Sequence, residues 1–202
     1  MKHYGCGMPP ESKIALERPD MRAHVLKAAL LAIEEVGFTR LRIRDIADRA
    51  GMSTGHVLYY FGSRDRILVS TLLMSEADLD ERRRVELAGL DDHAALERLV
   101  ELYLPKSAQD VRWRLWAQVV ARPPDDEETL LRLDGFFRSW AAALATVVRR
   151  LAGLGAEAAE DFAVRHCRLM DGLSNDVLLG MPGHDATWAK EAVLASMRRE
   201  LP

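Results

Sequence analysis

The sequence has little cysteine and no long apolar run, and both deficits exclude classes of protein. Among its 202 residues there are 2 cysteines, Cys6 and Cys167, which lie far apart and in different contexts. This spacing supports neither a disulfide framework nor a metal site. Apolar runs such as 28–33 and 140–145 stop far short of the roughly 18 residues that a membrane span requires, and the start of the chain has no apolar signal-peptide core. We therefore expect a cytoplasmic protein with no membrane partner, no metal and no cofactor.

Proline is missing from two long stretches, which favours helices over them. Proline inside a helix removes a hydrogen bond and clashes with the preceding turn, and the 8 prolines leave 20–104 and 125–181 free. Segments with the period-two alternation of strands, rich in Val, Ile and Thr, are also lacking. With 49% hydrophobic and 29% charged residues, the composition is that of a globular protein with a core. The sequence therefore predicts an all-α fold.

Charge is divided unevenly along the chain. The net charge is -3, but of the 28 Lys and Arg and the 31 Asp and Glu, residues 1–70 carry 11 and 8, and residues 71–202 carry 17 and 23. Only the first third is therefore basic. Blanket attraction to polyanions is not expected, whereas a local patch that meets phosphate is compatible with this division.

Apolar spacing and turn residues predict nine helices behind a flexible arm of residues 1–18, which contains glycines and prolines. Gly37 and Gly51 stand where a helix ends, because glycine suits the positive φ that follows a helix. Ser53 and Ser63 have side chains that can cap the next two helices. The expected helices cover about 20–36, 43–50, 54–61, 64–88, 92–104, 109–121, 125–152, 157–179 and 185–201.

These helices divide into a small N-terminal unit and a larger C-terminal domain. Helices of about two turns are too short to be stable alone and must pack on neighbours. The first three therefore form one compact unit over 19–66. The fourth is long enough to leave that unit and to join the larger domain of residues 67–202.

Residues 43–61 form two short helices across a glycine-containing turn, which is the helix-turn-helix layout that places a second helix in the major groove of DNA. Val57 and Phe61 lie four residues apart and can be buried against the unit. The opposite face offers hydrogen-bond donors and aromatic rings near a helix N-terminus, whose free N–H groups also suit phosphate. Six arginines against three aspartates over 40–66 surround it with positive charge. The outward residues are Thr54, Gly55, His56, Tyr59 and Tyr60.

The run from Val25 to Leu68 resembles the DNA-binding domain of the TetR family of transcriptional regulators. The resemblance is carried by the stretches 35–38, 43–47, 50–55 and 59–64, with the spacing typical of that family. Leu169–Leu173 also resembles a segment of the family's later helices. The resemblance implies a homodimeric repressor that binds a palindromic DNA operator and releases it when the second domain binds a small effector.

Two positions depart from the family's pattern. Leu58 stands where a tyrosine usually contacts a backbone phosphate, and Arg42 stands where the second helix usually begins with threonine. The resemblance implies that Arg44 reaches a base or a phosphate. Arg64 replaces the usual lysine at the start of the fourth helix and keeps its charge.

Aromatic and adaptable side chains gather in the second domain, where they are expected in the core and, as a group, around an apolar cavity. His166 and Asp171 are its expected polar anchors, and the effector is expected to be small and largely hydrophobic. A short recognition helix buries too little to be specific alone, so we also expect a two-fold dimer built from the last two helices. Phe136 belongs to the same group of side chains. The cavity candidates are Trp113, Trp116, Phe137, Trp140, Phe162, His166 and Met170. The dimer-interface candidates are Cys167, Val177, Leu194 and Met197.

Other functions are compatible with parts of the sequence. Gly51–Gly55 fits the G-x-S-x-G pattern of a hydrolase with Ser53 as nucleophile, but that pattern requires a preceding strand where a helix is predicted. An all-α enzyme could use His166 and Asp171, although no catalytic pair or metal cluster is recognisable. An interaction module that has lost DNA binding would favour an acidic or apolar recognition face, unlike the face around His56 and Tyr59.

Residues 80–84 combine two acidic and three basic residues. The acidic neighbours and the i,i+4 pair of Asp80 and Arg84 favour a solvated helix face over a nucleic-acid tract.

Overall fold

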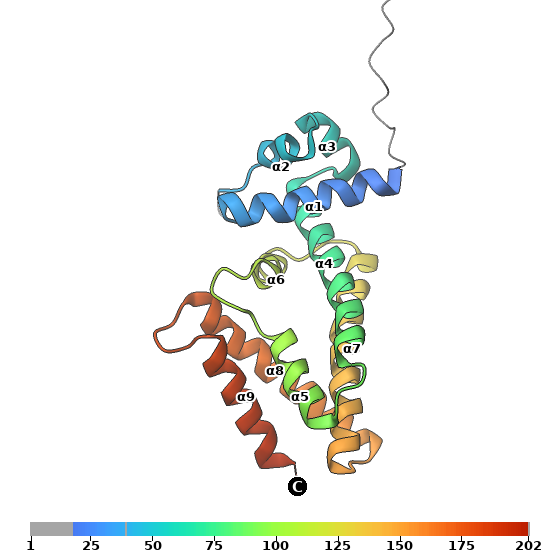
Figure 1. The fold of residues 1–202 in the computed structure, drawn as a ribbon. Helices are drawn as coiled ribbons and strands as arrows, with labels where there is room; N and C mark the ends of the chain where they lie inside the picture. The colour runs from blue at the N-terminus through green and yellow to red at the C-terminus, as the bar shows by residue number, and fades with distance from the viewer. Residues whose placement is uncertain (1–17, 39, 202) are drawn as a thin grey trace, which may run out of the picture.

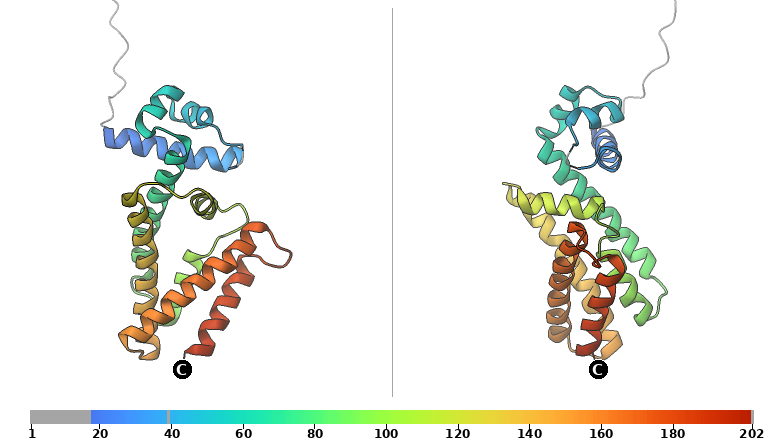
Figure 2. Two further views of the ribbon diagram at one scale, coloured as in Figure 1. Left: turned by 180° about the vertical axis from the view of Figure 1, so that it is seen from behind. Right: turned by 90° about the vertical axis from the view of Figure 1, so that its left-hand side faces the viewer.

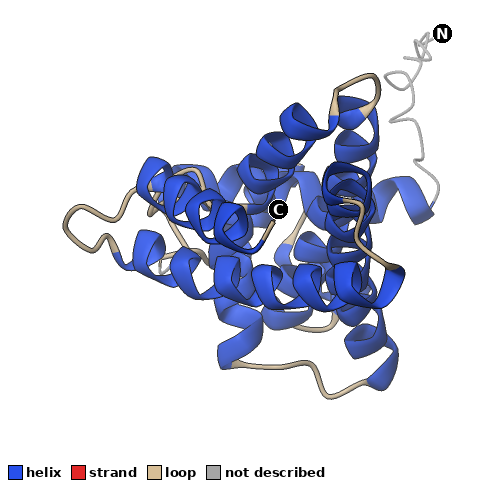
Figure 3. Cartoon of the chain, turned by 90° about the horizontal axis from the view of Figure 1, so that it is seen from below, coloured by secondary structure: helices blue, strands red, loops and turns tan. Residues whose placement is uncertain are grey.

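The computed structural model describes residues 18–38 and 40–201, and over these ranges the chain forms helices and loops without a strand (Figure 1, Figure 3). The all-α prediction is confirmed. Over the same ranges, no helix combines the length and the apolar character needed to cross a membrane. The predicted arm lies outside the described residues. The helices are α1 (Arg18–Val36), α2 (Ile43–Ala50), α3 (Thr54–Phe61), α4 (Arg64–Leu87), α5 (Asp92–Tyr103), α6 (Val111–Ala121), α7 (Glu127–Ala152), α8 (Ala156–Leu179) and α9 (Ala186–Glu200).

Local sequence signals determine where the short helices begin and end. Gly51 follows α2 with φ 64° and ψ 30°, a left-handed conformation that glycine adopts without a steric penalty. The Oγ of Ser53 accepts the N–H of His56 at 3.2 Å and caps α3. Ser63 caps α4 in the same way, with the N–H of Arg66 at 3.2 Å. The predicted caps are therefore confirmed.

Two hydrophobic cores form, and α4 contributes to both, as this helix runs from the N-terminal helices into the larger domain (Figure 2). Ile67 and Leu68 of α4 are buried with side chains of α1, α2 and α3 in the first core. Leu115 of α6 lies in that same core, so the N-terminal unit rests on α6, which also contacts α1 and α4. Farther along α4, Leu79 and Leu87 pack against the second core, formed by α5, by α7 to α9 and by Trp113 of α6.

The apolar stripes of α8 and α9 face the chain's own core. Cys167 and Leu194 are 5% and 6% exposed, and Val177 and Met197 are still less accessible. The prediction that these four side chains form a dimer interface is therefore wrong. The same apolar spacing that indicated a contact with a second copy is used here for contacts of α8 with α7 and α9.

Residues 80–84 of α4 are only partly solvated. Arg84 is exposed and lies 3.5 Å from Asp80, as predicted. Arg83, however, is 4% exposed, because α4 packs against α7 at this point. Its guanidinium donates to Asp80 and to the Oγ of Ser139, and it lies over the ring of Trp140. Burial lowers the pKa of Arg83, and the Asp80 carboxylate opposes that shift. The solvated-face prediction is wrong for this residue.

The turn after α2 can be tested by adding one methyl group. Gly51→Ala should lower the free energy of unfolding by about 1 to 2 kcal/mol, because alanine in a left-handed conformation brings its Cβ too close to the following carbonyl oxygen. Urea denaturation of the free protein measures the loss. Gly135→Ala is the matched control, since Gly135 is exposed inside α7 with open space at its Cβ position. It should stabilise the protein by about 0.5 to 1 kcal/mol, and an equal effect of both substitutions would contradict the turn assignment.

Candidate functional site

The exposed face of α3 presents the side chains predicted for contact with DNA. Val57 and Phe61 are buried, which turns Thr54, Gly55 and His56 outward. Tyr59 is 74% exposed. The last of the predicted residues, Tyr60, is only partly exposed: its ring lies 5.2 Å from that of His56, and its side chain packs against the first core.

Two arginines predicted for nucleic-acid contact have different surroundings. Arg44 has an 80% exposed side chain, tied only by an exposed pair with Asp48 at 3.4 Å. Arg64 instead donates to the carbonyl oxygens of Leu41 at 3.3 Å and Phe38 at 3.2 Å. These bonds fasten the loop between α1 and α2 to the start of α4, so the structure uses this guanidinium within the chain. The Arg44 guanidinium, held only by this exposed ion pair, is accessible to an external partner.

The two departures from the family's pattern lie on opposite sides of the turn. Arg42 is exposed at the N-cap of α2, and its backbone N–H donates to the carboxylate of Asp45 at 2.7 Å. Leu58 is partly buried on α3.

The hydrolase interpretation of Ser53 fails on local structure. A nucleophile elbow needs a strand before the serine, and within the described residues the preceding element is α2, a helix. The Ser53 hydroxyl accepts the N–H of His56 as a helix cap.

A cavity of about 380 Å³ lies in the larger domain, walled by α4 to α8. Its size falls within the roughly 300–1,000 Å³ of small-molecule sites. Four of the predicted candidates line it, and aromatic rings form most of its apolar wall. The aromatic lining residues are Tyr103, Trp113, Trp116, Phe136, Phe137 and Trp140.

Three predicted cavity residues lie elsewhere. Phe162, His166 and Met170 are buried in the second core and do not line the cavity. The Nδ1 of His166 donates to the carbonyl of Phe162 at 2.9 Å, and its Nε2 lies 3.4 Å from Ser196 Oγ on α9. The prediction of His166 as a polar anchor is therefore wrong, because this face of α8 turns toward α9. His166 and Asp171 do not pair, which removes the geometry that an enzyme using both would need.

Two carboxylates provide the acidic groups of the cavity wall. Asp171, predicted as an anchor, accepts the hydroxyl of Tyr103 at 2.6 Å and a guanidinium N–H of Arg168 at 3.0 Å. Burial, followed by the nearby Asp171 charge, raises the pKa of Tyr103 well above its usual value, so this hydroxyl stays protonated as a donor.

The second carboxylate, Glu76, is 1% exposed and was missed by sequence reasoning. It accepts Arg112 Nη1 at 3.1 Å and Trp116 Nε1 at 2.7 Å. The sequence does contain a signal for its burial. Glu76 follows Leu73 by three residues and Leu72 by four, so it lies on the apolar stripe of α4.

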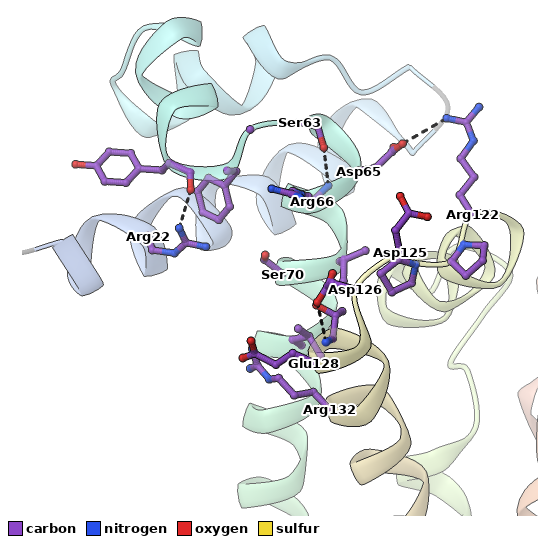
Figure 4. Close-up of a pocket in the computed structure, with 18 of the residues that line it drawn as sticks. Arg22, Ser63, Asp65, Arg66, Ser70, Arg122, Asp125, Asp126, Glu128 and Arg132 are labelled. Atoms are coloured by element: carbon purple, nitrogen blue, oxygen red, sulfur yellow. Dashed lines mark hydrogen bonds and ion pairs between the residues drawn. The ribbon is translucent and has the colours of Figure 1, made fainter.

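A second, polar cleft of about 850 Å³ separates the N-terminal unit from the turn between α6 and α7 (Figure 4). Arg22 of α1 donates to the carbonyl of Tyr60 on one side. On the other, Arg122 lies 3.6 Å from Asp65 of α4. The Arg122–Asp65 ion pair thus connects the two parts of the chain across this cleft, while α6 supports the unit through the apolar core.

Two family models together match most of the chain. Residues 25–71 match a family model described as bacterial regulatory proteins, tetR family, and residues 92–202 match one described as BetI-type transcriptional repressor, C-terminal. The HTH-type transcriptional regulator BetI of Serratia proteamaculans (strain 568) is 34% identical over 82 residues, or 41% of each chain. BetI of Klebsiella pneumoniae (strain 342) is 30% identical over 114 residues, 52% of this chain and 58% of that one. The first of these alignments thus spans about two fifths of the curated relative.

Solved structures resemble the chain over nearly its whole length. A transcriptional regulator from Saccharomonospora viridis in complex with choline has a TM-score of 0.76 and 26% identity, covering 91% of this chain and 98% of that one. A TetR transcription regulator from Haloarcula marismortui ATCC 43049 has a TM-score of 0.69 at 20% identity, covering 89% and 96%, and shows the shared fold.

The role of Arg64 within the chain gives a stability test. Arg64→Ala should lower the free energy of unfolding by about 1 to 3 kcal/mol, because two backbone carbonyls lose a charged donor. Arg44→Ala is the matched control in the same unit. It should change the free energy of unfolding by less than about 0.5 kcal/mol, because the ion pair of Arg44 is exposed. Chemical denaturation of the wild type and of both variants measures these free energies of unfolding. Equal losses would show that Arg64 does not fasten the loop.

Proposed function

We propose that this chain, which belongs to the TetR family of transcriptional regulators and has a BetI-type C-terminal domain, binds a DNA operator as a repressor. It releases the operator when a small molecule enters the cavity. The observation that carries the DNA-binding part is the exposed face of α3, capped by Ser53 and flanked by the exposed guanidinium of Arg44. The proposal places the protein in the cytoplasm and assigns it no catalytic step.

The chemistry of α3 supports sequence-specific contact. A major groove about 12 Å wide admits an α-helix, and side chains on its N-terminal turns can reach base edges. His56 and Tyr59 are exposed there, and Gly55 has no side chain to hold the helix away from the bases. Arg44 supplies charge for a phosphate or a base at the edge of this face.

We propose that the regulator acts as a two-fold dimer. An eight-residue recognition helix contacts too few base pairs to define an operator alone, whereas two copies read two half-sites about 34–36 Å apart, or a multiple of that spacing. Because the apolar stripes of α8 and α9 are buried within the chain, contact between copies falls to outward side chains, of which Val164 and Leu179 on α8 are 45% and 74% exposed.

Operator binding is tested by removing the two side chains assigned to bases. His56→Ala and Tyr59→Ala should each weaken binding by about 1 to 3 kcal/mol and relax sequence choice, as expected for base-edge contacts. The operator is first obtained by selection from random duplexes, and affinity is then measured by fluorescence anisotropy at fixed salt. His93→Ala, which removes an exposed histidine of α5, should leave affinity unchanged. Full affinity in both α3 variants would refute the assignment of this face to the groove.

We propose a small organic cation as the effector. Aromatic rings line the cavity, and cations bind favourably over such rings. Glu76 and Asp171 place carboxylates in the same wall, each paired with an arginine that also lines the cavity. The choline bound to the regulator of Saccharomonospora viridis supports this class of molecule. A cation thus replaces the largely hydrophobic effector expected from the sequence, since the polar anchors are carboxylates and not His166.

Choline and its neutral carbon isostere 3,3-dimethylbutan-1-ol separate charge from shape. Choline should bind about 2- to 30-fold more tightly, because a positive charge over aromatic rings contributes about 0.5 to 2 kcal/mol. Isothermal titration calorimetry measures both constants, and choline should also dissociate the selected operator complex. Equal affinities, or no binding of choline, would refute an organic cation as the ligand class.

A further inference from the structure

The contact between α4 and α6 at the cavity wall is charged. Glu76 belongs to α4, which begins in the N-terminal unit, and both of its hydrogen-bond donors, Arg112 and Trp116, belong to α6. The carboxylate is 1% exposed, and the Arg112 side chain is 13% exposed. A buried carboxylate is costly unless a cation or donors compensate it. Arg112 therefore neutralises a charge that α4 carries into the domain.

Arg112 stands where an organic cation would find the best surroundings. Its guanidinium lies 5.1 Å from the centre of the Trp113 ring while it pairs with Glu76. It also donates to the backbone carbonyl of Tyr103 at the end of α5. A carboxylate and an aromatic face are the two features that attract a quaternary ammonium group, and here a side chain of the protein already occupies both.

A second guanidinium repeats this arrangement without joining two helices. Arg168 pairs with Asp171 at 3.0 Å and lies over the Phe137 ring at 4.7 Å. Both members of this ion pair belong to α8, and the Arg168 side chain is 58% exposed. Displacing it would break no ion pair between helices. Glu76 and Arg112 thus form the charged pair of the cavity wall that connects the ligand to the helix leading to α3.

We propose that Arg112 competes with the ligand for Glu76. This inference rests on the proposed cavity for an organic cation. When such a cation binds beside Glu76, two positive groups meet one carboxylate, and Arg112 gives way, because its side chain is 13% exposed whereas Glu76 is 1% exposed. The carboxylate keeps a cationic partner throughout, while α6 loses its charged tether to α4. The ligand therefore favours the arrangement in which the ion pair between the two helices is broken, which is the differential binding that a switch requires.

Two substitutions in one ion pair should change ligand affinity in opposite directions. Arg112→Met removes the competitor and should raise choline affinity about tenfold, whereas Glu76→Gln removes the attracting charge and should lower it about tenfold. Both variants lack the tether, so both should bind the selected operator about fivefold or more weakly without choline. A purely structural pair would shift both choline affinities in the same direction.

Calorimetry with choline and anisotropy with the operator supply the two readouts. Arg114→Met is the matched control: Arg114 lies on α6, donates to the carbonyl of Ala108 at 2.8 Å, and does not line the cavity. It should leave both affinities unchanged. Arg112→Lys keeps the charge and should resemble the wild type. In the Glu76→Gln background, Arg112→Met should no longer raise choline affinity.

The outcomes separate this inference from the proposal on which it rests. Wild-type protein that binds choline, together with an Arg112→Met variant that binds it no more tightly, would overturn the competition alone. Wild-type protein that binds no choline would overturn the ligand class and the competition together. If Arg112→Met is too unstable to isolate, thermal unfolding of Arg112→Gln with added choline decides: stabilisation greater than that of the wild type is expected, and no greater stabilisation would overturn the competition.

Discussion

A single continuous helix belongs to both hydrophobic cores, and the rest of the structure depends on that constraint. The 24 residues of α4 span about 36 Å. Ile67 and Leu68 are buried with the N-terminal helices, and Leu79 and Leu87 pack on the larger domain. Because close-packed cores resist small distortions, a displacement at one end of α4 is transmitted along a rigid element. The position of α3 is thus tied to the packing around the cavity.

The cavity and the second core share side chains. Trp113 and Trp140 line the cavity and are only 8% and 6% exposed. Each ring therefore contacts the cavity on one side and the core on the other. Cavity shape is set by the same contacts that stabilise the domain, which keeps the rings rigid in the absence of ligand. When a ligand binds, the charged side chains of the wall can adjust, because they can exchange hydrogen-bond partners without opening a void in the core.

Sequence alone predicted the helices and their ends because these depend on local chemistry. Gly51 and Ser53 act within one turn of the chain, and their conformations follow from glycine's freedom and the serine hydroxyl. The exposed face of α3 could be predicted in the same way, because the apolar spacing of its short helix shows which side is buried and which is left exposed.

Side-chain partners across helices could not be predicted, because they depend on how helices are rotated against one another. His166 and Asp171 lie five residues apart on α8, yet one faces α9 and the other the cavity. Arg64 and Arg83 look solvated in sequence, and neighbouring carbonyls, a hydroxyl and an aromatic ring take up their guanidinium groups. Periodicity gives the width of a buried stripe, but it does not identify the element that covers it.

The division of charge along the chain has a kinetic consequence once it is placed on the fold. The described residues of the basic first third form one end of the molecule and the acidic remainder lies toward the other, with α4 running between them (Figure 1). In the field of a polyanion such a particle experiences a torque that turns its basic end forward, and the acidic body is repelled from the same surface. Unproductive sideways encounters are thereby shortened. In the proposed DNA-binding function, the acidic domain would thus help to orient the protein during approach, although it carries none of the side chains assigned to DNA.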